Sequence, residues 1–240
     1  RRTAGETAAF HGVRPENVLL TNGADEAIHA AVRALVPAGG KILLPVPSFS
    51  VYEAAARLRG ARIETALYGP DLAFPLAEGI GKLSAGIRLI LVVTPNNPTG
   101  PTVNAEELAA FLDRVPSSVT VVLDEAYLEF VTAEDAPDCL ALPRERDNVV
   151  VLRTCSKAFG LAGLRVGYAV AHPPIAAALR KTAIPFGVNS LAQVAAIASL
   201  DAVDELDVRV KEIVAERERV VAALREQGWE LPDAQANFVW

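Results

Sequence analysis

The chain has 240 residues, of which 51% are hydrophobic and 22% are charged, and its formal net charge is -6 at pH 7. This composition predicts a compact globular fold and argues against disorder. The length suits one large domain, or one domain with part of another. Long nucleic-acid contacts require clustered Lys and Arg, so we expect no nucleic-acid partner.

The residue types present limit other partners as well. The two cysteines, Cys139 and Cys155, allow neither a zinc-binding spacing nor a disulfide framework, so we expect no metal site and a reducing, cytoplasmic compartment. The longest apolar stretches, such as residues 89–93, are too short to span a bilayer, and we expect no membrane partner. The sequence lacks methionine, begins inside a helical pattern and ends in a strand pattern. We therefore expect both ends of the natural protein to lie outside it.

Strand and helix patterns alternate along most of the chain. Helices are predicted at 23–36, 48–59 and 104–112, with Ser48 and Asn104 as N-terminal caps. Strands are predicted at 18–20, 42–44, 62–67, 87–93, 119–123, 149–152 and 166–170. Their aliphatic runs suit strands buried on both faces of a parallel sheet. The alternation predicts an α/β fold with a mainly parallel sheet flanked by helices.

The pattern becomes helical near residue 189. A long, charged, amphipathic helix is predicted over 204–226, Gly228 ends it, and a strand is predicted from Ala236 onward. We predict that residues 1–188 form a large domain that lacks its natural N-terminal part. Residues 189–228 would form interdomain helices, and residues 229–240 would begin a smaller C-terminal domain.

Polar residues at the ends of the predicted strands are candidate site residues, because ligands of parallel sheets bind at the carboxyl ends of strands. Lys157 lies in an apolar loop, where a charged amine is costly and a neutral, nucleophilic one is favoured. A surface lysine is the alternative, which the apolar flanks disfavour. Asp124 ends a strand, and a buried carboxylate needs a partner such as a protonated pyridine nitrogen. Taken alone, Asp124 fits an ordinary turn cap better.

Other candidates are weaker individually. Asn97 lies in a turn rich in proline, 94–100, where Asn97-Pro98 is a candidate cis peptide bond or an ordinary turn. The helix start at Gly23 offers free N–H groups for a phosphate, and Arg165 could complete that site by a bidentate contact. Plain first-turn acids and a surface ion pair are the alternatives. Phe49 and Tyr52 are candidates to stack on a flat ring or to pack in the core.

Four segments together carry a resemblance to a known family. Residues 21–26, 94–100, 123–127 and 156–165 are similar to motifs of the fold-type I, class I/II aminotransferases, and above all to the histidinol-phosphate aminotransferase family with its aromatic aminotransferase branch. The likeness runs from Gly12 to Trp240, and four motifs in the right order are far more specific than one. It implies the large domain of a fold-type I transferase and the cofactor pyridoxal 5'-phosphate (PLP).

The resemblance also implies residue roles. Lys157 would hold the cofactor as a Schiff base and move protons, and Asp124 would pair with the pyridine nitrogen. Asn97 and Tyr127 would bind the phenolic oxygen of the ring. Phe49 takes the ring-stacking position, where many relatives have tyrosine. The phosphate would be held by a last group of residues: Ala24, Asp25, Thr154, Ser156 and Arg165.

The implied activity is transfer of an amino group between histidinol phosphate or an aromatic amino acid and 2-oxoglutarate. The resemblance implies a homodimer with shared sites, an Arg beyond Trp240 that binds the substrate carboxylate, and an N-terminal lid before Arg1. Residues 235–240 look most like the aromatic branch. Two alternatives remain open: a threonine-phosphate decarboxylase with the same cofactor motifs, and an aminotransferase-like regulatory domain of a transcription factor.

Overall fold

A mixed sheet of seven strands forms the centre of the described chain, which in this computed structural model comprises residues 2–84 and 86–240. The strand order is β1-β7-β6-β5-β4-β2-β3. Strands β2 to β6 run parallel, whereas β7 is antiparallel to both of its neighbours. The strands are β1 (Val18–Thr21), β2 (Lys41–Val46), β3 (Arg62–Leu67), β4 (Ile87–Val93), β5 (Thr120–Asp124), β6 (Val149–Thr154) and β7 (Gly167–Ala171).

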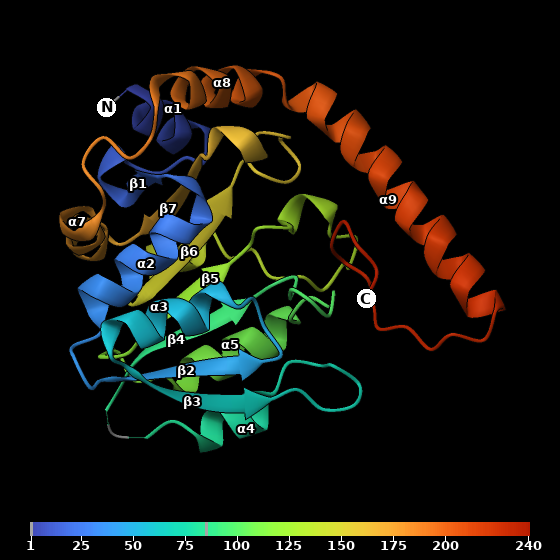
Figure 1. Cartoon of the computed structure of the whole chain (residues 1–240), viewed down its shortest axis with the longest axis horizontal. Coiled ribbons are helices and arrows are strands. Elements are labelled where there is room, and N and C mark those ends of the chain that lie inside the picture. The colour runs from blue at the N-terminus through green and yellow to red at the C-terminus, as the bar shows by residue number, and fades with distance from the viewer. Residues whose placement is uncertain (1, 85) are drawn as a thin grey trace.

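Helices cover both faces of this sheet (Figure 1). The α-helices are α1 (Arg2–Phe10), α2 (Gly23–Leu35), α3 (Val51–Arg59), α4 (Leu76–Gly81), α5 (Ala105–Arg114), α6 (Leu142–Glu145), α7 (Pro173–Thr182), α8 (Ser190–Asp201) and α9 (Val203–Glu226). Short 3-10 turns occur at η1 (Pro15–Asn17), η2 (Leu128–Phe130) and η3 (Ala162–Leu164). In the described part of the chain, none of these helices is both long and apolar enough to cross a membrane.

Two hydrophobic clusters lie on opposite faces of the sheet. Helices α2, α3 and α7 pack with Val122 and Leu152 in one cluster, while α4 and α5 pack with Val121 and Leu123 in the other. Successive side chains of a strand point to opposite faces, so the aliphatic run of β5 contributes to both. This three-layer arrangement confirms the predicted α/β fold with a mainly parallel sheet.

The C-terminal helices extend beyond the sheet. Helix α8 packs on α1, and the long α9 reaches away from the sheet in Figure 1. The chain after α9 returns to the segment that follows η2, where Gln235 Oε1 accepts a hydrogen bond from the Thr132 N–H over 2.7 Å. The predicted division into domains stays a prediction. The predicted strand from Ala236 is wrong, because the Ala236 carbonyl accepts a hydrogen bond from Arg217 over 3.1 Å instead of pairing in a sheet.

The predicted helix start at Ser48 is also wrong. Helix α3 begins at Val51, and Ser48 stands in the loop before it. Asn96 Nδ2 donates to the Pro47 carbonyl over 3.0 Å and holds that segment as part of the loop. By contrast, Asn104 caps α5 as predicted, because its side chain accepts hydrogen bonds from the N–H groups of Glu106 and Glu107.

Candidate active site

The candidate site lies at one edge of the sheet. The carboxyl ends of the strands β1 to β6 face this edge, and the antiparallel direction of β7 brings its amino end there as well. A cavity of about 150 Å³ opens at this edge. Every residue that the sequence predicts for the site lines it, together with Tyr52, Val93 and Ala126: Ala24, Asp25, Phe49, Asn97, Asp124, Tyr127, Thr154, Ser156, Lys157 and Arg165.

A buried carboxylate forms the floor of this cavity. Asp124 is only 4% exposed, and its Oδ2 accepts a hydrogen bond from the Tyr52 hydroxyl over 2.6 Å. Its Oδ1 accepts one from the Ala126 N–H over 3.0 Å. Burial raises the pKa of Asp124 to about 6, while the hydrogen bonds from Tyr52 and Ala126 oppose the rise. A cationic group placed against Asp124 would stabilise the ionised form.

Tyr52 is a site residue whose role the sequence does not reveal. Its ring is almost fully buried and meets the Phe49 ring edge to face at 5.9 Å between centroids. Burial, followed by the charge of Asp124, raises the pKa of Tyr52 well above its ordinary value. The hydroxyl therefore stays protonated and acts as a donor to Asp124. The helical spacing of α3 indicates a buried position but not a partner 72 residues away in sequence.

A second group of side chains lies on the loops after β4, β5 and β6. Asn97 Nδ2 donates to the Tyr127 hydroxyl over 3.1 Å, and the Asn97-Pro98 peptide bond is cis, as the sequence suggested. Lys157 Nζ lies 5.1 Å from the centroid of the Tyr127 ring, within the range of a cation–π contact. The loop neighbours Cys155 and Ala158 are buried as expected, but the Lys157 side chain itself is exposed toward the cavity.

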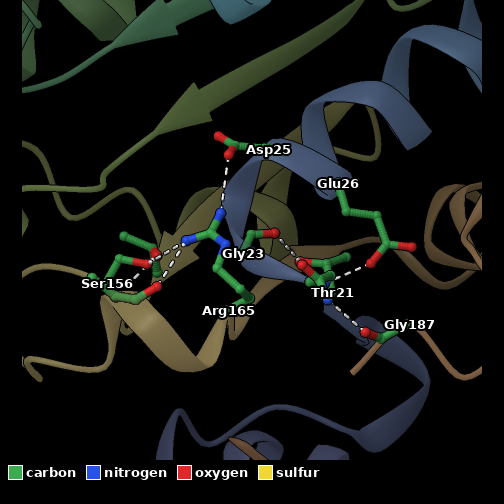
Figure 2. A network of polar contacts seen from close by, with 10 residues as sticks. Thr21, Gly23, Asp25, Glu26, Ser156, Arg165 and Gly187 are labelled. Carbon is green, nitrogen blue, oxygen red and sulfur yellow. Dashed lines mark hydrogen bonds and ion pairs between the residues drawn. The ribbon is translucent and has the colours of Figure 1, made fainter. Parts of the chain in front are cut away.

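Arg165 precedes β7 by two residues, and its side chain lines the end of the cavity that lies beside the start of α2. Its Nη2 contacts Asp25 Oδ2 at 3.0 Å, and its Nη1 donates to Ser156 Oγ over 3.4 Å and to the Ala162 carbonyl over 3.1 Å (Figure 2). The backbone of Arg165 is left-handed, with φ of 59°. The guanidinium is thus oriented beside the first turn of α2, where free N–H groups favour an anion.

Glycine allows this close approach. Gly23 opens α2 with φ of 70°, and a Cβ atom there would lie 2.5 Å from Arg165 Nη2. A side chain at Gly167 would meet the backbone of Arg153 and Ala24 within 2.9 Å. We refer to the start of α2, Thr154, Ser156 and Arg165 as the anion cradle.

A buried ion pair, which the sequence did not predict, joins the carboxyl ends of β5 and β6. Arg153 Nε donates to Glu125 Oε2 over 2.7 Å, and both side chains are nearly inaccessible to solvent. These residues directly precede Thr154 and follow Asp124. The pair therefore ties the end of β6 to the end of β5, which carry those two site residues.

Fold and cavity define an α/β protein whose cavity, at the carboxyl edge of the sheet, presents the Arg165 guanidinium and the buried Asp124 carboxylate. The aminotransferase class I and II family matches residues 4–240, so the chain belongs to this family.

Individual relatives agree with this assignment. The chain is 50% identical to an aromatic amino acid aminotransferase of Streptomyces avermitilis over 98% of this chain and 66% of that protein. It is 53% identical to one of Streptomyces coelicolor over 87% of this chain and 58% of that protein. The histidinol-phosphate aminotransferase of Sinorhizobium meliloti, solved in complex with pyridoxal-5'-phosphate, superposes with a TM-score of 0.92 at 29% identity, covering 99% of this chain and 65% of that one. The chain thus spans 58% to 66% of the length of these two curated relatives.

Proposed function

We propose that this chain forms the cofactor-binding part of a PLP-dependent aminotransferase. The observation that carries the proposal is the convergence of the Asp124 carboxylate, the Lys157 amine and the Arg165 guanidinium on one cavity. PLP carries a basic ring nitrogen, an aldehyde and a phosphate, which match these three groups in chemistry. The complex of the Sinorhizobium meliloti structure with the same cofactor supports this match.

The residues at the ring end would hold the cofactor and move protons. When bound, PLP supplies an electron-withdrawing ring that stabilises negative charge on the substrate carbon. Lys157 would hold the cofactor covalently through Nζ and, once released by the substrate, act as the base at the α-carbon. Asp124 would keep a proton on the ring nitrogen, because a buried carboxylate is stabilised by a cation beside it. Asn97 and Tyr127 would bind the phenolic oxygen.

The remaining predicted residues would orient the cofactor. Phe49 would stack on the ring, and the phosphate would bind the N–H groups of Ala24 and Asp25, the hydroxyls of Thr154 and Ser156, and Arg165. Asp25 and Ser156 already orient the fork of Arg165. Phosphate binding would therefore require little rearrangement of this side chain.

We infer that the substrates are an aromatic amino acid or histidinol phosphate as amino donor and 2-oxoglutarate as acceptor. The names of the Streptomyces relatives favour the aromatic donor. The buried free thiols Cys139 and Cys155 suit the reducing cytoplasm.

We also infer a homodimer. Large apolar side chains are exposed on the loop between α7 and α8 and on α8 itself, where Phe186 is 102%, Leu191 73% and Val194 68% exposed. Apolar side chains grouped in this way are typical of an interface between proteins. A second copy of the chain would cover them.

Reduction with borohydride tests the cofactor assignment directly. The protein is incubated with PLP, reduced, digested and mapped by mass spectrometry. We expect the pyridoxyl group on the peptide that contains Lys157, and we expect Lys157→Ala to lose it, because no other amine lines the cavity in the described part of the chain. Lys211→Ala, an exposed lysine on α9, is the matched control and should label normally at Lys157.

Activity assays then separate the substrate classes. Phenylalanine, tyrosine and histidinol phosphate are offered as donors with 2-oxoglutarate, and formation of glutamate is measured. Release of CO2 from threonine phosphate would favour the decarboxylase alternative. Failure of the wild-type protein to become labelled at Lys157 would overturn the proposed function.

A further inference from the structure

A buried glutamate that the proposed chemistry does not use lies directly behind the anion cradle. Glu26, on the first turns of α2, is 7% exposed. Its Oε2 accepts a hydrogen bond from the Asn22 N–H over 2.5 Å, and its Oε1 accepts one from the Ile184 N–H over 2.7 Å. Figure 2 shows the Glu26 side chain turned back toward the end of β1, on the far side of Gly23 from Arg165.

These contacts fasten the loop between α7 and α8 to the start of α2. Asn22 Nδ2 adds a third bond, to the Gly187 carbonyl over 2.7 Å. We refer to Asn22, Glu26 and their contacts with Ile184 and Gly187 as the clamp. The clamp joins segments that lie 158 and 165 residues apart in sequence. The loop it holds carries the exposed Phe186.

The clamp needs a charged acceptor and a glycine. Among the described residues, Glu26 forms no ion pair with a cationic side chain within 4.0 Å. A buried carboxylate without a cation is costly, and here backbone N–H donors offset the cost. A Cβ atom on Gly187 would lie 3.0 Å from Glu26 Oε2. A side chain at this position would therefore require the carboxylate to move by a few tenths of an ångström, which glycine avoids.

The backbone that the clamp fixes leads directly into the cradle. Asn22 precedes Gly23, which packs against Arg165, and Ala24 and Asp25 follow and line the cavity. Thr21 Oγ1 holds the Gly23 carbonyl over 2.8 Å from the other side. A shift of Asn22 would therefore move the first turn of α2, which lines the cavity.

We propose that Glu26 is a positioning residue for phosphate binding, which acts through the Asn22 backbone and the 184–187 loop without touching the ligand. This inference rests on the proposed function, because it takes the phosphate of PLP as the ligand of the cradle. If Glu26 has this role, the affinity for the phosphate depends on the 184–187 loop, which carries the exposed Phe186. At the ring end of the cavity, Asp124 accepts hydrogen bonds from Tyr52 and Ala126, which are not part of the clamp.

Comparison of PLP with pyridoxal, which lacks the phosphate, tests the role of Glu26. In Glu26→Gln the amide keeps the shape but can accept only one of the two N–H bonds through its oxygen. We expect its dissociation constant for PLP to rise severalfold, because the loosened Asn22 backbone has to be ordered again when the phosphate binds; about tenfold, the full effect of one lost hydrogen bond to a charged group, is the upper bound. The dissociation constant for pyridoxal should not change. Equilibrium dialysis with each compound measures both.

Two further variants keep the test decisive. Glu78→Gln is the matched control, because Glu78 Oε2 also accepts a backbone N–H, from Leu67 over 2.8 Å, but on α4 and outside the cavity. It should bind PLP as the wild type does. Gly187→Ala adds a methyl group against the Glu26 carboxylate and leaves the carboxylate in place. This variant should show the same selective loss of PLP affinity. It replaces Glu26→Gln in the test if Glu26→Gln does not fold.

The outcomes separate the two claims. Equal weakening of PLP and pyridoxal binding, or no change in either, would overturn the positioning role while leaving the proposed cofactor intact. If the wild type binds PLP no better than pyridoxal, the phosphate assignment fails, and the role of Glu26 fails with it.

Discussion

The Tyr52 hydroxyl donates a hydrogen bond of 2.6 Å to Asp124 Oδ2 in the interior of the protein. Tyr52 is 1% exposed and Asp124 4%, so neither group can exchange its partner freely for water. The Ala126 N–H holds the other carboxylate oxygen. The carboxylate is therefore fixed in orientation from two sides, and these two hydrogen bonds offset part of the rise in its pKa that burial causes.

Removal of this donor should shift the titration of Asp124. In Tyr52→Phe we expect the pKa of Asp124 to rise further above about 6, because the tyrosine hydrogen bond lowers it. Carbon NMR of the carboxyl groups in the cofactor-free protein measures this. The dissociation constant for PLP should rise about tenfold or more, since a hydrogen bond to a charged group is lost. Tyr168→Phe is the control, because that buried hydroxyl bonds His11 outside the cavity. An unchanged Asp124 titration in Tyr52→Phe would contradict the argument.

Asp124 should reduce the stability of the cofactor-free protein. Its folded pKa, about 6, lies above the ordinary value of 3.8. The folded state thus holds the proton more tightly than the unfolded state, and stability falls as the pH rises through this window. We expect cofactor-free Asp124→Asn to be more stable than the wild type by roughly 1–3 kcal/mol at about pH 8 and to differ little at about pH 4. Urea unfolding at both pH values measures this, and a variant that is less stable at the higher pH would refute it.

Gly23 should be required for anion binding beyond its effect on stability. Gly23 and Gly60 share nearly the same left-handed backbone, with φ of 70° and 69°. A Cβ atom at Gly60 meets nothing within 4 Å, whereas one at Gly23 meets Arg165. Both alanine variants should lose about 1–2 kcal/mol of stability from backbone strain. Only Gly23→Ala should also weaken PLP binding. Parallel urea unfolding and PLP titrations of both variants would show this, and equal PLP affinity in the two would count against the cradle.

The parts of the fold that the sequence predicts are those set by local patterns. The aliphatic runs of β4 and β5 match their burial on both faces, so the sheet and its ligand-binding edge follow from the sequence. Asp124, Asn97 and Lys157 were found because polar residues at strand ends contrast with these runs. The four family motifs then added Tyr127 and supported the phosphate-binding role already considered for Arg165.

The features that the sequence does not reveal depend on distant contacts. The reversed direction of β7, which brings Arg165 to the cavity, depends on pairing with β6 and β1. Glu26 has the pattern of an ordinary first-turn acid, because its partner Ile184 lies on another loop. A strand at Ala236 would need a neighbouring strand to accept its backbone hydrogen bonds. The Ala236 carbonyl instead accepts a hydrogen bond from the distant Arg217 side chain.

His11 should make the protein less stable in mild acid. Its Nε2 lies 2.6 Å from the Tyr168 hydroxyl, and burial, with a smaller effect of the Arg153 charge, lowers the pKa of His11 from 6.5 to about 4. Between these values the unfolded chain binds a proton that the folded protein does not, so stability is lost as the pH falls through this window. His11 is partly exposed, and solvent screening reduces the effect to about 1–2 kcal/mol.

The contribution of His11 is measured by comparing variants across that window. Between about pH 6.5 and pH 4, we expect the free energy of unfolding of His11→Gln to fall by about 1–2 kcal/mol less than that of the wild type. Urea unfolding at a series of pH values measures this. His29→Gln, on α2, is the control for removal of a histidine side chain. If the profile of His11→Gln follows the wild type, neither the burial of this ring nor the charge of Arg153 lowers the pKa of His11, and the acid sensitivity has another source.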